Sequence, residues 1–112
     1  MEALAVLADP ARRRIVECLA DNEVSAGELT DVMKTEFGLV QPATSRHLRR
    51  LRESGLVHSR AEGTRRLYSL DPAALRDIDT WLEQFRGLWG DALSALDAEV
   101  RRGKSSTKSD AQ

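Results

Sequence analysis

The hydrophobic period of this chain changes twice, and these two changes limit the folds that the chain can adopt. Up to Gly55, apolar residues recur at helical spacing, and after Asp71 they do so again. Between these points, residues 56–61 and 66–70 alternate apolar and polar side chains around a turn that contains Gly63. Alternation on both sides of a glycine-containing turn is typical of a β-hairpin. We therefore predict short helices, then one hairpin, then one long helix.

Short sequence signals mark the ends of the first helices. Asp9 precedes Pro10, and this pair predicts a helix start, because Asp is a favoured N-cap residue and Pro is tolerated at the first helical position. Ser25 and Glu28 have the spacing of a capping box. Gly38 can adopt the left-handed conformation that ends many helices. We expect helices over residues 10–20 and 27–37.

The segment 41–54 predicts a helix with two different faces. Thr44, Leu48 and Leu51 are spaced four and three residues apart and form a narrow stripe that we expect to be buried. The other faces carry amide, hydroxyl and guanidinium groups. Gly55 is expected to end this helix.

Asp71 and Pro72 repeat the helix-start signal and precede a long amphipathic segment. Apolar residues recur three or four positions apart from Leu75 to Val100. Gly87 and Gly90 lower the helix propensity inside this segment, so we predict a bend or a break there.

Three helices followed by a hairpin is the order of a winged helix-turn-helix, and we predict this mainly α fold with a β-hairpin wing. The major groove of DNA admits one α-helix, and its base edges differ for each base pair. We expect helix 41–54 to read these edges and the wing, residues 56–70, to contact phosphates or the minor groove. The residues expected to contact DNA are Gln41, Thr44, Ser45, Arg46, His47, Arg49, Arg50, Arg60, Thr64, Arg65 and Arg66. For His47 a packing role is an equal alternative.

The charge distribution supports a DNA partner, although the formal net charge is only −1. Residues 41–66 contain seven arginines and two glutamates, whereas the segments on either side are acidic. The local field matters more than the net charge when a protein surface meets phosphates. A solvated charged face is the simpler alternative. The position of the arginines on the predicted helix and wing favours one DNA-facing surface.

Three segments, residues 7–15, 41–57 and 62–68, resemble the ArsR (arsenic-repressor-like) family of transcription regulators. The resemblance implies a homodimeric repressor whose subunits join through the first and last helices. It also implies that helix 41–54 reads a partly palindromic operator. Two features differ from the family: Val40 stands where a capping Ser or Thr is common, and the connection from Asp31 to Gln41 is longer.

Large apolar side chains crowd the last predicted helix. A domain of this size can bury only some of them within itself, and large exposed apolar patches are rare on monomers. The alternative is that both tryptophans cover the domain's own core. The residues expected in a dimer interface are Leu4, Leu7, Trp81, Leu82, Phe85, Leu88, Trp89, Leu93 and Leu96.

We expect neither a metal site nor a catalytic site. Soft metal ions need clustered thiolates and zinc needs about four ligands. Helix 27–37 contains no cysteine, the last helix contains no histidine, and Asp77 and Asp79 do not share a helix face. We interpret Cys18 as a structural thiol and His58 as a surface residue. No nucleophile–base set, paired acids or phosphate-binding loop suggests an enzyme, and we expect no cofactor.

The remaining expectations concern organisation and location. The length fits one domain, residues 1–102, followed by a disordered polar tail, residues 103–112. We expect a cytoplasmic protein, since the start lacks a basic signal-peptide region, no apolar run could cross a membrane, and Cys18 is the single cysteine. Expected partners are double-stranded DNA and a second copy, with no membrane partner and no inducer specified by the sequence. The competing interpretation is a winged-helix module that binds only proteins.

Overall fold

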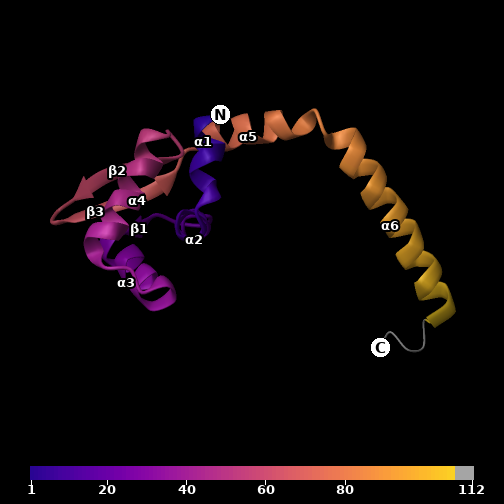
Figure 1. Ribbon diagram of the computed structural model, residues 1–112, viewed down its shortest axis with the longest axis horizontal. Helices are drawn as coiled ribbons and strands as arrows, with labels where there is room; N and C mark the ends of the chain where they lie inside the picture. Colours follow the sequence, from indigo (N-terminus) through magenta and orange to yellow (C-terminus); the bar gives the residue numbers. More distant parts are fainter. Residues whose placement is uncertain (108–112) are drawn as a thin grey trace. The chain divides into compact units, whose positions relative to one another are not determined.

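A computed structural model describes the backbone of residues 1–107 and the side chains of residues 1–102. The chain divides into two compact units, Met1–Ile78 and Asp79–Gln112 (Figure 1). The first unit contains the predicted winged helix-turn-helix.

The first unit begins with α1 (Glu2–Ala5), the short 3-10 helix η1 (Val6–Ala8) and α2 (Pro10–Cys18). Asp9 is the N-cap of α2, as predicted: its Oδ1 accepts hydrogen bonds from the backbone N–H groups of Ala11 at 2.8 Å and Arg12 at 3.2 Å. The helix ends at Cys18, two residues before the predicted end.

The second predicted helix is also confirmed, with its start one residue earlier than predicted and its end at the predicted residue. Helix α3 (Ala26–Phe37) starts with the capping box, in which Ser25 Oγ accepts from the Glu28 N–H at 3.2 Å and Glu28 Oε1 accepts from the Ser25 N–H at 3.4 Å. Gly38 ends α3 in the left-handed conformation, with φ of 65°. Helix α4 (Gln41–Glu53) then begins after residues 38–40, so residues 31–37 belong to α3 and the connection between the two helices has three residues.

The hairpin forms as predicted and gains a third strand. Strands β2 (Val57–Glu62) and β3 (Arg65–Leu70) pair antiparallel, and Gly63 has φ of 61° in the two-residue turn, where a type II′ hairpin turn requires glycine. The short strand β1 (Val24–Ser25) pairs with β3, so the strand order is β1-β3-β2. Two residues are too few to show an alternating pattern, and for this reason β1 was not predicted.

The last predicted helix is broken, but not at the predicted place. Helix α5 (Pro72–Glu83) and helix α6 (Arg86–Thr107) are separated at Gln84 and Phe85, whereas Gly87 and Gly90 lie inside α6. The expected break at these glycines is therefore wrong. Helix α6 extends to Thr107, so the expected disordered tail does not begin at residue 103. Residues 108–112 lie outside the described residues, and for them the tail remains a prediction.

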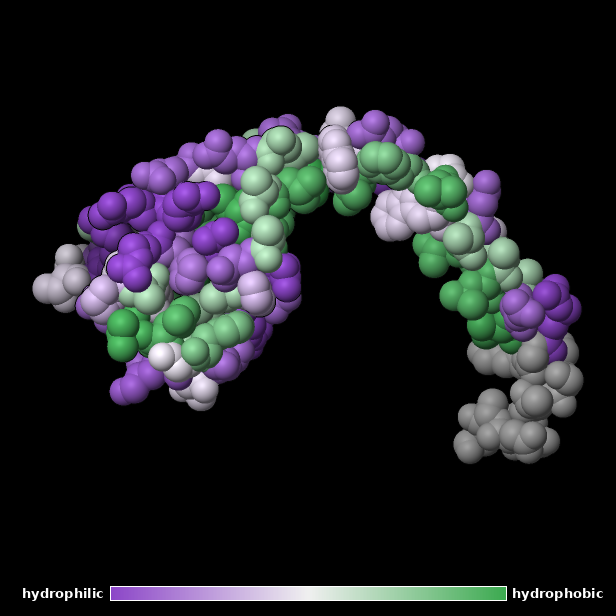
Figure 2. All heavy atoms as spheres, in the orientation of Figure 1, coloured by the Kyte–Doolittle hydropathy of each residue, from purple (hydrophilic) through white to green (hydrophobic). Residues whose placement is uncertain are grey.

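Side chains of α5 and α6 beyond Ile78 are largely exposed, and Figure 2 shows apolar side chains along this part of the chain. Trp81 and Phe85 form an edge-to-face pair with ring centroids 5.0 Å apart. The Arg86 guanidinium lies 5.9 Å from the Trp89 ring centroid, within the range of a cation–π contact. No helix among the described residues has the length and apolar character needed to cross a membrane.

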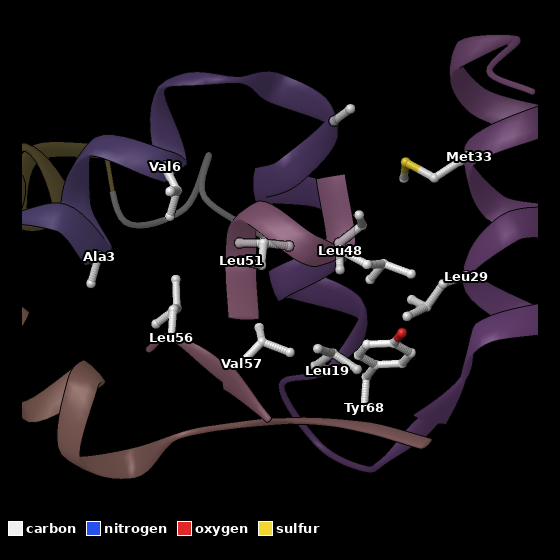
Figure 3. Packing of buried hydrophobic residues seen from close by; sticks show 12 residues of the cluster. Ala3, Val6, Leu19, Leu29, Met33, Leu48, Leu51, Leu56, Val57 and Tyr68 are labelled. Carbon is white, nitrogen blue, oxygen red and sulfur yellow. The ribbon is translucent and has the colours of Figure 1, made fainter. Parts of the chain in front are cut away.

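The core of the first unit lies between α2, α3, α4 and the sheet (Figure 3). Ile15 of α2, Leu29 of α3, Leu51 of α4 and Leu56 before β2 are completely buried. Tyr68 of β3 points into the same cluster, beside Leu29 and Leu19 in Figure 3. The core therefore holds α4 against two helices and the sheet.

Candidate nucleic-acid interface

Helix α4 has a buried face and an exposed face, as its sequence predicts. Thr44, Leu48 and Leu51 are 0%, 3% and 0% exposed and fix the helix in the core. The exposed side chains include those of Gln41, Ser45, Arg46, Arg49 and Arg50. A helix that reads DNA needs this combination of a fixed position and free hydrogen-bonding groups.

Arg46, Arg49 and Arg50 have no hydrogen-bond or ion-pair partner among the described side chains. They lie three and four positions apart, so their guanidinium groups share the outer face of α4. Like charges at this spacing disfavour a helix slightly. The three arginines thus form a local positive surface that no side chain of residues 1–102 pairs with.

Two other predicted contact residues of α4 lie deeper in the protein. Thr44 is completely buried and its hydroxyl has no partner among the described residues, so its side chain has no surface for DNA. His47 is half-buried, and its Nδ1 lies 3.3 Å from Arg12 Nη1. Arg12 Nε also donates to the Val6 carbonyl at 2.7 Å. This contact connects α4 with α2 and η1, in agreement with the packing alternative for His47.

The start of α4 lacks a side-chain cap. Val40 occupies the N-cap position with φ of −83° and ψ of 161° and makes no side-chain hydrogen bond to the helix. Its carbonyl accepts from the N–H groups of Ala43 and Thr44 at 3.0 and 3.2 Å. The helix thus begins at Gln41 without a capping side chain.

The arginines of the wing do not share one face, so the expectation of a single surface is wrong for this part. Adjacent strand residues point to opposite faces, and cross-strand partners point to the same face. One face of the hairpin therefore carries Arg60 and Glu62, together with Arg65, which is the cross-strand partner of Glu62. Arg66 lies on the other face, with the core residue Tyr68, and donates to Ser59 Oγ at 3.2 Å.

Two wing arginines are paired with carboxylates of the protein. Arg60 binds Glu23 through two hydrogen bonds, Nε to Oε2 and Nη2 to Oε1, each 2.8 Å long. Glu62 accepts from Arg60 Nη2 at 3.3 Å and from Arg65 Nη2 at 3.0 Å. The hydrogen bond with Glu23 raises the pKa of Arg60 further above its ordinary value and lowers the pKa of Glu23. The hydrogen bond from Arg65, together with the charge of Arg60, lowers the pKa of Glu62.

The sequence analysis did not identify Glu23 as a partner of the wing arginines. It lies 37 positions from Arg60, immediately before β1, and no local pattern connects the two residues. The strand order, which places β3 between β1 and β2, brings them together.

A second contact joins the base of the wing to α5. His58 Nε2 lies 2.8 Å from Asp71 Oδ2, and His58 is exposed, as predicted. The backbone N–H of Ala73 and the His58 contact lower the pKa of Asp71. The Asp71 carboxylate therefore accepts a backbone hydrogen bond at the start of α5 and contacts His58 near the start of β2.

The residues considered as metal ligands are dispersed. Cys18 is half-buried, and Asp77 and Asp79 are exposed on α5. Among the described residues, no three His, Cys, Asp or Glu side chains lie close enough together to hold a metal ion.

Figure 2 shows hydrophilic side chains gathered over α4 and the hairpin. A helix with a buried face and a free arginine-bearing face, followed by a basic β-hairpin, defines a winged helix-turn-helix DNA-binding protein. Comparisons with known proteins agree with this class.

Residues 7–60 match the family described as "Helix-turn-helix domain". The chain is 41% identical over 92 residues to the HTH-type transcriptional regulator Rv2034 of Mycobacterium tuberculosis, covering 82% of this chain and 79% of the relative. It is 33% identical over 75 residues to the arsenical resistance operon repressor of Staphylococcus aureus, covering 67% and 68% of the two chains. A crystal structure titled as a possible transcriptional regulator for arsenical resistance matches with a TM-score of 0.66 and 36% identity, over 88% of this chain and 96% of that chain.

The chain belongs to the ArsR family of winged helix-turn-helix transcription regulators. It is a DNA-binding regulator, and the comparisons do not favour the alternative of a module that binds only proteins.

Proposed function

We propose that two copies of this chain form a homodimer that represses transcription by binding a partly palindromic operator. The observation that carries the proposal is the unpaired arginine face of α4, opposite a face that the core fixes. Arginine suits guanine and glutamine suits adenine through paired hydrogen bonds in the major groove. In this proposal Arg46, Arg49 and Gln41 contact the base edges. The neighbouring residues Ser45, Arg50 and His47 belong to the same DNA-binding surface.

The wing adds contacts to the DNA backbone in this proposal. Arg66 is exposed on the face of the hairpin that also carries Tyr68. Thr64 is exposed in the turn, next to Arg65. Phosphate and minor-groove contacts of this kind set the register of the protein on DNA but do not identify the sequence.

The second copy covers the exposed apolar side chains of α5 and α6. Trp81, Phe85 and Trp89 are 40%, 42% and 44% exposed, and Leu88 is 78% exposed. Monomeric proteins rarely leave such a patch in water. Leu93 and Leu96 continue it along α6, and Leu82, Leu4 and Leu7 are half-buried members of the proposed interface. Two-fold symmetry then places two copies of α4 about 34 Å apart, in successive major grooves.

Repression is inferred from the family and from the function named for the staphylococcal relative. A dimer that occupies an operator near a promoter excludes the transcription machinery. We further propose that the protein acts in the cytoplasm as a binding protein, with no catalytic activity and no cofactor.

Footprinting of the DNA upstream of the protein's own gene tests this proposal. We expect one protected site with two similar halves, and loss of transcription from a reporter that carries the site. The Arg46→Ala variant should bind the site more weakly by about 1–3 kcal/mol and should lose base preference within each half. The exposed Arg76 on α5 provides the control, because Arg76→Ala makes the same change outside the proposed interface.

A salt series distinguishes this function from protein-only binding. Each phosphate that the protein neutralises releases a counterion, so DNA affinity should fall steeply as salt rises. A folded protein that binds no duplex at low salt would contradict the proposed function. An Arg46→Ala variant with unchanged affinity and base preference would contradict the assignment of the reading face.

A further inference from the structure

The outer face of the hairpin carries a network of two arginines and two carboxylates. Arg60 lies between Glu23 and Glu62, and Arg65 binds the other oxygen of Glu62. Two of the three nitrogen atoms of the Arg60 guanidinium, Nε and Nη2, are occupied by Glu23. All four side chains are exposed, at 37–59%.

The arginines of α4 and those of the wing therefore differ in their readiness to bind phosphate. Arg46, Arg49 and Arg50 have no partner among the described side chains, whereas Arg60 and Arg65 are held by carboxylates. A carboxylate and a phosphate bind a guanidinium with the same donor geometry. The two ligands therefore compete for the same N–H groups.

We propose that Glu23 and Glu62 limit the affinity for DNA by competing with its phosphates for Arg60 and Arg65. The inference rests on the proposed operator binding and assigns these two carboxylates a role within it. Exposed ion pairs are weak, because water screens them, so a phosphate can replace either carboxylate. Each exchange leaves a displaced carboxylate near the DNA and lowers the net gain from the contact.

The competition acts on all sequences alike, because phosphate contacts carry no base information. Arg60 and Arg65 then add little to binding on arbitrary DNA. The base-reading contacts of α4 provide a larger share of the total affinity, and the protein leaves DNA more easily.

The variants Glu23→Gln and Glu62→Gln of the full-length chain test the proposal. Each should bind operator and random duplexes more tightly, by about threefold to tenfold at physiological salt, and should steepen the salt dependence by about 0.9, the value of one additional phosphate contact. Glu36→Gln is the matched control. It removes an exposed bidentate pair with Arg14, with distances of 2.9 and 3.3 Å, and changes the net charge equally, but it joins α2 and α3 outside the wing.

The Arg60→Gln background separates competition from a general charge effect. If Glu23 acts through Arg60, Glu23→Gln should give no gain in a chain that already carries Arg60→Gln. A gain of equal size in that background would overturn the proposal, as would a Glu23→Gln variant that binds like the wild type.

Weaker binding of Glu23→Gln would also overturn the proposal, because it would show that Glu23 supports the wing and does not compete with DNA. Measuring the wild type in parallel distinguishes a failure of the proposed function from a failure of this inference. A folded wild type that binds no DNA contradicts the proposed function itself, whereas a wild type that binds, together with unresponsive carboxylate variants, contradicts only this inference.

Discussion

Asp9 connects a local sequence signal to the stability of the first unit. Its carboxylate accepts two backbone hydrogen bonds at the start of α2. Burial raises the pKa of Asp9, but the N–H groups of Arg12 and Ala11 lower it more, and the folded value lies below the ordinary 3.8. The folded protein thus binds fewer protons here than the unfolded chain. The contribution of Asp9 is complete above the ordinary pKa and is lost as the pH falls through the folded value.

We expect Asp9→Ala to lower the free energy of unfolding by about 1 kcal/mol at pH 7, the usual cost of a lost N-cap. Asp9→Asn is the control, because asparagine caps a helix without titrating. Urea unfolding at a series of pH values should show the Ala variant approaching the wild type as the pH falls, since protonation of Asp9 removes the contribution of its charge. Equal stability of wild type and Asp9→Ala at pH 7 would disprove this role.

Contacts between residues close in sequence could be predicted, and contacts across the fold could not. The caps at Asp9 and Ser25 depend on spacings of two or three residues, which are visible in the chain itself. The pairing of Arg60 with Glu23 depends on strand order, and no residue type at either position indicates it. The placement of Arg60 and Arg65 on the same face follows only from the register of the hairpin.

At the scale of elements, α4 begins with an exposed residue that cannot cap it. Val40 is 68% exposed and has the extended backbone conformation of an N-cap residue. A serine hydroxyl there could share the N–H of Ala43 with the carbonyl of residue 40, which already accepts it at 3.0 Å, whereas Pro42 has no N–H to donate.

We expect Val40→Ser to raise the free energy of unfolding by about 0.5–1 kcal/mol, at the lower end of capping effects, because the hydroxyl shares its donor with a backbone carbonyl. Val40→Ala tests whether the gain comes from the hydroxyl, since alanine removes the same apolar surface without adding an acceptor. Thermal or urea unfolding measures both variants. An equal gain in the alanine variant would assign the effect to the loss of valine.

Most elements could be predicted because each has its own period and its own end signals. The prediction located α2, α3, α4, the hairpin and the start of α5 within a few residues. It misplaced the break between α5 and α6, because Gly87 and Gly90 lower helix propensity only modestly, and a Cβ at either position would meet nothing within 4 Å, so no close approach required glycine there. The chain breaks instead at Gln84 and Phe85, where no residue type signals an end.

At the scale of the whole molecule, the proposed dimer depends on the apolar side of α6. Trp89, Leu93 and Leu96 lie on one side of this helix, at spacings of four and three residues, and Ser94 lies on another side. A charge placed on the apolar side would have to be buried without a partner in the dimer, which is costly.

We therefore expect Trp89→Glu to convert the protein to a monomer and to reduce operator affinity at least tenfold, because two linked half-sites bind far more tightly than one. Light scattering with size-exclusion chromatography, followed by a gel shift, measures both effects. Ser94→Glu adds the same charge to the same helix and should leave both unchanged. A dimeric Trp89→Glu variant with wild-type affinity would assign the interface elsewhere.

The three free arginines of α4 have a consequence for the protein without DNA. They repel one another on a single face of the helix. Bound DNA screens this repulsion, because its phosphates lie close to the same guanidinium groups. Ligands that bind only the folded state raise its stability. In the proposed complex, DNA therefore raises the stability of the folded regulator and relieves the repulsion within α4.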